Sequence, residues 1–410
     1  MQCALLLHVS TLQIMHYWIA AASIWGLGMS SPKLATAQTA QQNPFRLAEE
    51  LLLSPEGNLD YVAPLRGLAA ANKQAFDSDM YSQVLETYNS FVGKFTPVVT
   101  KRLASPYALA EVGPLLAVRA RSTSVVLINE AHNQPAHRAY CRQLLRQLTP
   151  LGYTWFAVEA LYPTDTSINE RKFPIAFSGF YTREPTMGKL LRTACANGFH
   201  VFGHEITAAQ DKAFADGVKR SNYRDSMQAV NILAVLRKNP KAKIVALVGY
   251  DHVLEKERNG VKRLATYLHE LGHLDPFTID QTQAYRSASG PPAARPMAVM
   301  GRNGSLITIG ERRGYVDMEV VHPAETLVQG RASWLGAVAS DKVVTAPIPA
   351  VYAGHRCLVQ LYDQQEYQQY GDQAIPLDQY FTAVWQKEVL LFGLATGRTT
   401  IIKYRPADLK

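Results

Sequence analysis

The pattern of hydrophobic and polar positions is most regular between about residues 122 and 282. Short apolar runs there alternate with segments in which apolar residues recur at helical spacing. Apolar runs of this length are typical of strands buried on both faces, and their alternation with helices predicts a parallel sheet covered on both sides. The expected strands are 125–129, 155–160, 200–205, 243–252 and 276–280, and the expected helices are 137–148, 185–196, 211–238 and 261–271.

The flanking segments have other patterns. Apolar spacing predicts short helices before residue 121, and mixed patterns after the loop-like stretch 287–296 predict an α+β extension that could add to the same sheet. Expected there are strands near 306–310, 316–321, 357–362 and 399–404 and a helix near 378–391. The predicted fold is a three-layer α/β protein: a parallel sheet with helices on both faces, a helical N-terminal segment and a C-terminal α+β extension. The expected divisions are 1–37, 38–121, 122–285 and 286–410.

The first 37 residues contain no Asp, Glu or Arg and one lysine, Lys33. Their apolar run from Ile14 to Met29 is followed by Ala35-Thr36-Ala37, a small-x-small pattern typical of signal-peptide cleavage sites. The positively charged start of a signal peptide is missing, so Met15 is an alternative first residue, and an uncleaved anchor is an alternative to a cleaved signal. We expect an exported protein, in the periplasm, the envelope or outside the cell, without a transmembrane segment in the mature chain.

Composition narrows the class of protein. Hydrophobic residues make up 47% of the chain and charged residues 19%, which excludes a disordered or fibrous protein. The net charge is +8, but Lys and Arg are spread along the chain and no five of them are consecutive. We therefore expect no nucleic-acid partner.

Acidic residues and histidines follow four consecutive predicted strands. The strand 125–129 leads into Glu130 and His132, the next into Glu159, the third into His204-Glu205, and the fourth into Tyr250-Asp251-His252. In an open parallel sheet the carboxyl ends of the strands meet at one edge, where ligands bind. Helix capping is the simpler alternative for any one of these residues. Four strands in succession favour a shared polar site.

The residue types in this site favour the activation of water. A histidine or carboxylate can take the proton directly, or a group such as His132, His252 and Glu130 can hold a divalent metal ion that acidifies the water. No G-x-S-x-G motif, P-loop or strand-linked G-x-G-x-x-G is present, which argues against a serine hydrolase of the α/β type and against a nucleotide cofactor. One helix adds Arg224, Gln228 and Asn231 on one face, with Asp225 beside them.

Several of these motifs together resemble a known superfamily. NEAH at 129–132, VEA at 158–160, RDSMQAVN at 224–231 and GYDH at 249–252 are similar to the pattern of the ChaN-like haem-uptake proteins, the Tiki metalloproteases and the erythromycin esterases. The resemblance covers about residues 122–282, and Asn129 stands where this pattern usually has glycine. It implies a pocket built from Glu130, His132, Glu159, Glu205, Arg224, Asp225 and His252.

Members of this superfamily hydrolyse esters, cleave peptides or bind haem iron, and fold alone does not decide between these activities. Our first hypothesis is a hydrolase of ester or amide bonds, with or without Zn, Mn or Co. The alternative is a haem- or iron-binding envelope protein in which His132, Tyr181 and His252 contact the cofactor. The expected partner is a small molecule, a peptide or haem. The connection 161–184 is rich in aromatic residues and is either a lid over the ligand or a self-packed loop.

A third hypothesis is a zincin protease. His269-Glu270-Leu271-Gly272-His273 matches H-E-x-x-H, whose two histidines bind zinc from one face of a continuous helix. Gly272 and the following Asp275-Pro276 predict that the helix ends inside the motif. We therefore expect this segment to bind no zinc and to lie away from the site at the carboxyl ends of the strands, which we call the crest site (Glu130, His132, Glu159, Glu205 and His252).

Overall fold

The computed structural model describes residues 43–95, 101–103, 107–283, 285–287, 295–336, 338, 341–395 and 397–407. The expected signal peptide, residues 1–37, lies outside these ranges. Within them, no helix combines the length and the apolar character that crossing a membrane requires.

The centre of the molecule is an eight-stranded, mostly parallel sheet with the order β2-β9-β10-β7-β3-β6-β4-β5. Strands β3 to β7 and β10 are parallel, whereas β9 and β2 run antiparallel at one edge. The bounds are β2 Ala108–Glu111, β3 Val125–Glu130, β4 Trp155–Val158, β5 His200–Gly203, β6 Ile244–Gly249, β7 Phe277–Asp280, β9 Met297–Met300 and β10 Met318–Val321.

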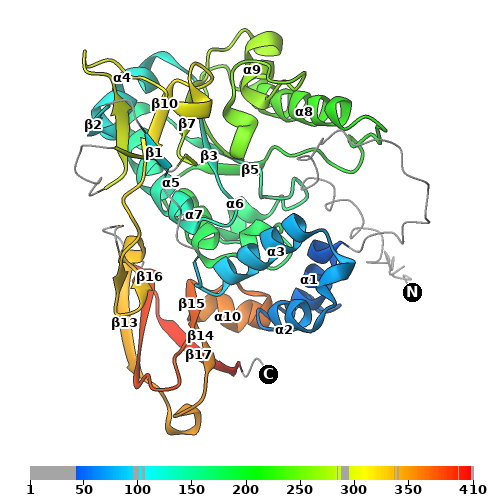
Figure 1. Cartoon of the computed structure of the whole chain (residues 1–410), viewed down its shortest axis with the longest axis vertical. Helices are drawn as coiled ribbons and strands as arrows, with labels where there is room; N and C mark the ends of the chain where they lie inside the picture. Colours follow the sequence, from blue (N-terminus) through cyan, green and yellow to red (C-terminus); the bar gives the residue numbers. More distant parts are fainter. Residues whose placement is uncertain are drawn as a thin grey trace, which may run out of the picture.

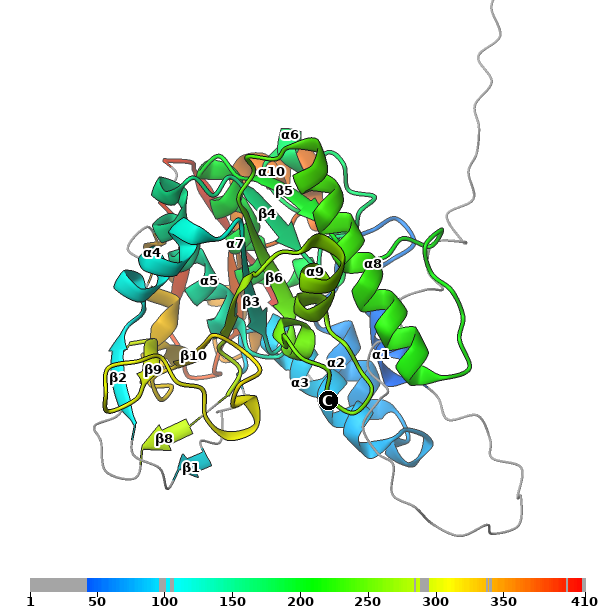
Figure 2. The same ribbon diagram turned by 90° about the horizontal axis from the view of Figure 1, so that it is seen from above.

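Helices cover both faces of this sheet. Successive side chains of a strand point to opposite faces: Val126 and Ile128 of β3 pack in one core with α4, α5 and α7, while Val125 and Leu127 pack in a second core with α8 and α9. Figure 2 shows these two groups of helices on opposite sides of the strands. The three-layer fold is therefore confirmed. The bounds are α4 Val112–Ser122, α5 Pro135–Leu148, α7 Pro185–Ala196, α8 Gly217–Lys238 and α9 Leu264–Gly272.

The N-terminal segment is helical over its first part, as expected, and these helices form a third core, whereas β1 (Lys101–Leu103) and β2 follow before residue 121. Phe180 of the 161–184 connection packs against Tyr88 and Phe91, with ring centroids 6.0 and 5.9 Å apart. Leu358 and Ile375 from the C-terminal part belong to the same cluster. The helices are α1 Pro44–Leu52, α2 Ala63–Ala70 and α3 Ser78–Phe91.

Besides the two-residue strands β11 (Leu327–Val328) and β12 (Arg331–Ala332), which pair with each other, the C-terminal part contains two larger antiparallel sheets (Figure 1). In one, β14 (Cys357–Asp363) lies between β15 (Asp378–Phe381) and β17 (Thr400–Pro406). In the other, β13 (Asp341–Pro347) pairs with β16 (Glu388–Leu394) along its whole length.

Shorter elements complete the described chain. The two short helices are α6 Ile168–Arg171 and α10 Gln364–Tyr370. The short strands are β1 Lys101–Leu103, β8 Tyr285–Ser287, β11 Leu327–Val328 and β12 Arg331–Ala332. The 3₁₀ turns are Lys73–Ala75, Thr149–Leu151, Tyr181–Arg183, Tyr250–Val253, Gly310–Arg312, Ser333–Gly336, Ala350–Tyr352 and Gly371–Gln373.

The structure departs from the sequence predictions mainly in the C-terminal part. No strand forms over 306–310, where one isolated bridge at Leu306 precedes a 3₁₀ turn. The helix expected near 378–391 is wrong: this segment forms β15, a turn and the start of β16. Val389 and Leu391 are fully buried and alternate with less buried residues, which is the period of a strand. The sheet also takes β2, β9 and β10 from outside the expected core of 122–285.

Buried ion pairs join the C-terminal part to one face of the α/β core. Arg142 of α5 donates two hydrogen bonds to Asp341, at 2.9 and 2.7 Å, and Arg192 of α7 binds Glu366 through Nε at 3.1 Å. The side chains in these pairs are at most 6% exposed. Each guanidinium is therefore compensated by a carboxylate from the other part of the chain, as buried charges require.

Candidate active site

The strand-end residues lie together because β3, β6, β4 and β5 are successive neighbours in the sheet. Glu130 ends β3, Glu159 follows β4, Glu205 follows β5, and His252 lies in the 3₁₀ turn after β6. Helix α8 crosses this edge and adds Arg224 and Asp225. Hydrogen bonds and ion pairs connect these side chains with one another, and His132 joins the group from the loop after β3.

Arg224 lies at the centre of the site. Its Nη2 donates to Oε1 of Glu159 at 2.5 Å, and its Nε donates to Oε1 of Glu205 at 3.1 Å. Gln228, one turn further along α8, donates to Oε2 of Glu205 at 3.0 Å, and Asn231 donates to the carbonyl of His204 at 3.0 Å. The face of α8 predicted from the spacing 224, 228 and 231 therefore points into the site and not into solvent.

His252 is held by carboxylates on two sides. Its Nδ1 lies 2.5 Å from Oδ1 of Asp225, and its Nε2 lies 3.5 Å from Oε1 of Glu159 and 3.2 Å from Nη1 of Arg224. Burial alone lowers the pKa of His252, but the negative charges of Asp225 and Glu159 outweigh burial and raise the pKa above its ordinary value. Asp225 also accepts from the backbone N–H of Leu264 at 2.8 Å, which fixes the carboxylate in place.

His132 forms a second pair with a carboxylate. Its Nδ1 lies 3.1 Å from Oε1 of Glu130, and Arg138 binds both oxygens of Glu130 at 2.7 and 2.8 Å. The imidazole stacks on Tyr181 with ring centroids 4.3 Å apart, and the ring of Tyr250 meets it edge to face at 5.3 Å. The side chain of His132 is 25% exposed, so this histidine borders solvent.

Gly249 lets His132 and Glu159 approach each other. A Cβ atom at this position would lie 2.7 Å from Nε2 of His132 and 3.4 Å from Oε2 of Glu159, so a larger residue would displace the imidazole. The backbone N–H of Gly249 donates to Oε2 of Glu159 at 2.6 Å. Nε2 of His132 therefore lies over the end of β6, beside Glu159, while Nδ1 is occupied by Glu130.

Charged neighbours keep the carboxyl groups of the site ionised. Burial alone raises the pKa of Glu130, but Arg138 and His132 outweigh it and lower the pKa to about 2. For Glu159, His252 and Arg224 likewise outweigh burial and hold the pKa well below its usual range. His204 differs, because burial lowers its pKa to about 4 and its ring nitrogens have no hydrogen-bond partner among the described residues.

One residue of the site, Arg138, and the backbone conformation of another, Tyr250, were missed from the sequence. Arg138 is fully buried and also donates to Glu184 at 3.0 Å and to the carbonyl of His132 at 2.9 Å, so it fixes the Glu130–His132 pair. Tyr250 has a φ of +29° and is 43% exposed, a strained conformation of the kind that concentrates at functional sites. The sequence did contain a signal for Arg138: this arginine lies in the first turn of the helix that follows β3, near the end of the strand that carries Glu130.

The residues do not fit a metal ion in this arrangement. The oxygens of Glu130 already accept from Arg138, and those of Glu159 accept from Arg224 and Gly249. The expected ligand set of His132, His252 and Glu130 is not assembled, and no group of three or more potential ligands forms among the residues that the structure describes. The guanidinium of Arg224 supplies the positive charge that the carboxylates need.

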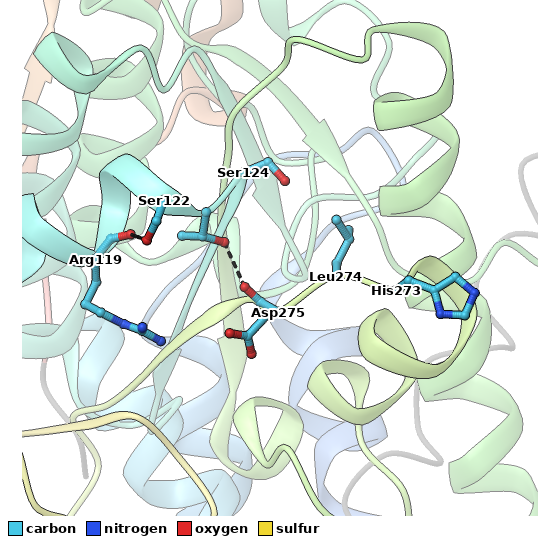
Figure 3. Close-up of a pocket in the computed structure, with 7 residues that line it drawn as sticks. Arg119, Ser122, Ser124, His273, Leu274 and Asp275 are labelled. Carbon is cyan, nitrogen blue, oxygen red and sulfur yellow. Dashed lines mark hydrogen bonds between the residues drawn. The ribbon is translucent and has the colours of Figure 1, made fainter.

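The H-E-x-x-H segment forms no zinc site either. Helix α9 ends at Gly272, and His273 follows it with a left-handed φ of +51°, so the two histidines do not share a helical face. Glu270 pairs with Lys262 at 2.8 Å. His273 instead borders a cavity of about 240 Å³ with Arg119, Ser122 and Asp275, at the amino-terminal edge of the sheet (Figure 3).

The aromatic connection 161–184 reaches the site through Tyr181 and through Glu184, which accepts from Arg138. Tyr181 stacks on His132, where the haem hypothesis also placed it. Phe180 packs against the N-terminal helices, and Phe173 packs against Tyr370 with ring centroids 5.6 Å apart. The aromatic side chains Phe180 and Phe173 of the connection therefore pack against the N-terminal helices and the C-terminal part. Neither of the two expectations, a lid over the ligand or a self-packed loop, predicted this packing.

The free energy of unfolding should decrease at acid pH because Glu130 becomes protonated. Its pKa is about 2 in the folded protein and near the ordinary 4.5 when unfolded, so the unfolded chain takes up this proton first. This contribution, roughly 3 kcal/mol, is complete above the ordinary pKa and is lost as the pH falls through the folded pKa. We expect the free energy of unfolding in urea to decline across this window, and to decline less in Glu130→Gln. Equal declines in both proteins would contradict the assignment.

Comparisons with known proteins give distant structural likenesses only. No protein-family model matches the chain, and no curated protein matches it. ChaN of Campylobacter jejuni, solved with cofacially bound heme, is 10% identical, with a TM-score of 0.34 over 55% of this chain and 100% of ChaN. An erythromycin esterase in its open conformation is 10% identical, with a TM-score of 0.33 over 68% of this chain and 98% of the esterase.

Bacterial toxins are also among the similar structures. RRSP, an effector domain of a Vibrio vulnificus MARTX toxin, is 19% identical, with a TM-score of 0.33 over 52% of this chain and 46% of RRSP. The chain spans about half the length of RRSP and of a second bacterial toxin, of which it covers 48%. These likenesses describe a distant structural relationship, and the chemistry has to follow from the residues of the site.

Proposed function

We propose that this protein hydrolyses ester or amide bonds with water activated by the histidines of the crest site. The observation that carries the proposal is the pairing of His132 with Glu130 and of His252 with Asp225, both beside Glu159. A carboxylate at Nδ1 fixes the tautomer of a histidine and leaves Nε2 for the reaction. Nε2 of His132 borders solvent, whereas Nε2 of His252 lies beside Glu159 and Arg224. Two such pairs around one shared space provide a base and an acid.

His132 is the general base in this proposal. Its Nδ1–H donates to Glu130, so its Nε2 is free to take a proton from water, and the ionised Glu130 stabilises the imidazolium that forms. Arg138 keeps Glu130 in place and ionised. The side chain of His132 borders solvent, which gives water and substrate access to it.

The positive charge opposite His132 comes from Arg224 and His252. The raised pKa of His252 favours its protonated form, which can donate a proton to the leaving group. The side chain of Arg224 is 22% exposed and contacts both Glu159 and His252, and its role in this proposal is to stabilise the negative charge that develops on the carbonyl oxygen. His132 thus withdraws a proton while His252 returns one.

Haem binding is the competing function. An apolar macrocycle requires a wide apolar cleft with a histidine or tyrosine at its floor. The side chains beside His132 and His252 are instead Glu130, Glu159, Asp225 and Arg224, and Tyr181 already covers one face of His132. Charged surroundings of this kind suit water and a polar substrate, so we favour hydrolysis.

One experiment separates the two functions. The purified protein is treated with a chelator, its absorption spectrum is recorded with and without added haem, and it is assayed against a panel of esters and peptides. We expect turnover that survives the chelator, with no Soret band from tightly bound haem. A stoichiometric Soret band without turnover on any substrate would favour the haem-binding function.

We also propose that the protein is exported, on the basis of the apolar run that ends at Ala35-Thr36-Ala37. We expect N-terminal sequencing of the natural protein to find a chain that begins near Gln38 outside the cytoplasm. An intact Met1 or Met15 in the cytosolic fraction would contradict this.

A further inference from the structure

Two neighbouring loops at the end of the β13–β16 ribbon expose large apolar side chains. Trp385 is 80% exposed, Val351 is 76% exposed and Val384 is 56% exposed. The backbone N–H of Ile348 donates to the carbonyl of Lys387 at 2.8 Å, which joins the loops. Residues 348–356 and 383–387 are called the ribbon tip here. Figure 1 shows the ribbon extending away from the main sheet and from helices α8 and α9.

The ribbon tip has the composition of a surface that meets lipid. The twelve residues from Val343 to Gly354 include none that is charged, and cationic side chains follow them at Arg356 and, on the second loop, at Lys387. Glu388 is the acidic neighbour at the end of β16. Tryptophan and tyrosine prefer the boundary between hydrocarbon and headgroups, and lysine and arginine bind anionic headgroups. Tyr352, stacked on Tyr404, lies in the same loop.

A second copy of the chain fits this surface less well. Stable protein interfaces bury about 800 Å² on each partner, and the tip offers one tryptophan and two valines, well below that area. Pro347 ends β13 without a backbone N–H, and the exposed Lys342 lies near its start, two features that discourage pairing along this strand. A bilayer needs no complementary shape and accepts a small protruding tip.

We propose that the ribbon tip docks the protein on an anionic lipid surface. Trp385, Val384 and Val351 insert at the level of the headgroups and upper acyl chains, while Lys387 and Arg356 contact the phosphates. This placement does not involve the crest site, so it stands independently of the hydrolase proposal.

The test is sedimentation of the protein with vesicles made of equal parts phosphatidylcholine and phosphatidylglycerol, compared with phosphatidylcholine alone. We expect stronger binding to the anionic vesicles, and at least about a tenfold weaker partition coefficient for Val384→Ser/Trp385→Ser, because two apolar side chains no longer leave water. Val118→Ser is the matched control, since Val118 is 70% exposed on α4 and should not change binding. All these positions are exposed, so the variants should fold like the parent protein.

Further measurements distinguish lipid from other partners. Lipids with brominated acyl chains should quench the fluorescence of the parent protein, and this quenching should disappear in Trp385→Phe. Lys387→Glu should weaken binding to the anionic vesicles only. Equal sedimentation of the parent protein and the double variant would overturn the proposal. So would concentration-dependent self-association in the ultracentrifuge that is lost in the double variant, because the tip would then bind a second copy.

Discussion

Replacing His252 by alanine should lower kcat/KM by about 100-fold or more, the usual effect of removing a group that transfers a proton in the transition state. His252 connects Asp225 with Glu159 and Arg224, so its loss removes the acid and leaves Asp225 with Arg263 and the backbone N–H of Leu264 as partners. His273→Ala should leave kcat/KM unchanged, because His273 lies at the opposite edge of the sheet. Hydrolysis of the best substrate from the ester and peptide panel measures both.

The Asp225→Asn variant tests how His252 works. The loss of this carboxylate should lower the pKa of His252, so the acidic imidazole is available only at lower pH and the pH–rate profile should shift in that direction. A purely structural role for Asp225 would lower kcat without moving the profile. Loss of activity in His273→Ala, with activity kept in His252→Ala, would contradict the crest-site assignment and favour the H-E-x-x-H segment.

Replacing Arg224 by methionine should cost about 3–5 kcal/mol of unfolding free energy, because it leaves the carboxylates of Glu159 and Glu205 without their shared cation. Urea unfolding near neutral pH measures the loss. Arg46→Met is the matched control: Arg46 pairs with Glu50 on the surface and is 61% exposed, so its removal should cost under about 1 kcal/mol.

A double variant checks the cause. Glu205→Gln removes one of the two charges that Arg224 compensates, so adding it to Arg224→Met should restore part of the lost stability. If the double variant is less stable than Arg224→Met alone, the loss comes from packing and not from uncompensated charge. A lower cost of Arg224→Met at acid pH would agree with the electrostatic explanation.

The core of the fold and the place of the site follow from local sequence signals. Buried strands such as β3 and β6 are continuous apolar runs, and the parallel arrangement then forces their carboxyl ends to one edge. Glu130, Glu159, Glu205 and His252 could therefore be placed together without knowledge of the strand order. Which carboxylate pairs with which cation could not be predicted. The pairs of Arg138 with Glu130 and of Arg224 with Glu159 and Glu205 depend on distances that exist only in the folded chain.

The C-terminal part was harder to predict for a physical reason. Between 378 and 391 the apolar residues fit helical and strand periods about equally, and the pairing partner of β16 is β13, more than forty residues away. Strand pairing over such a distance leaves little trace in the local pattern. The same holds for β9 and β10, whose addition to the main sheet depends on tertiary contacts with β7 and β2.

The ion pairs between α5, α7 and the C-terminal part bear on how this protein can be divided. An α/β fragment ending after β10 would keep Arg142 and Arg192 but lose Asp341 and Glu366, their carboxylate partners. Each guanidinium would then be exposed to water on a helix face that is buried in the full chain, without the carboxylate that neutralises it. The α/β layers are thus not a transferable module, and a shortened version for engineering would need neutral residues at 142 and 192 before it could stand alone.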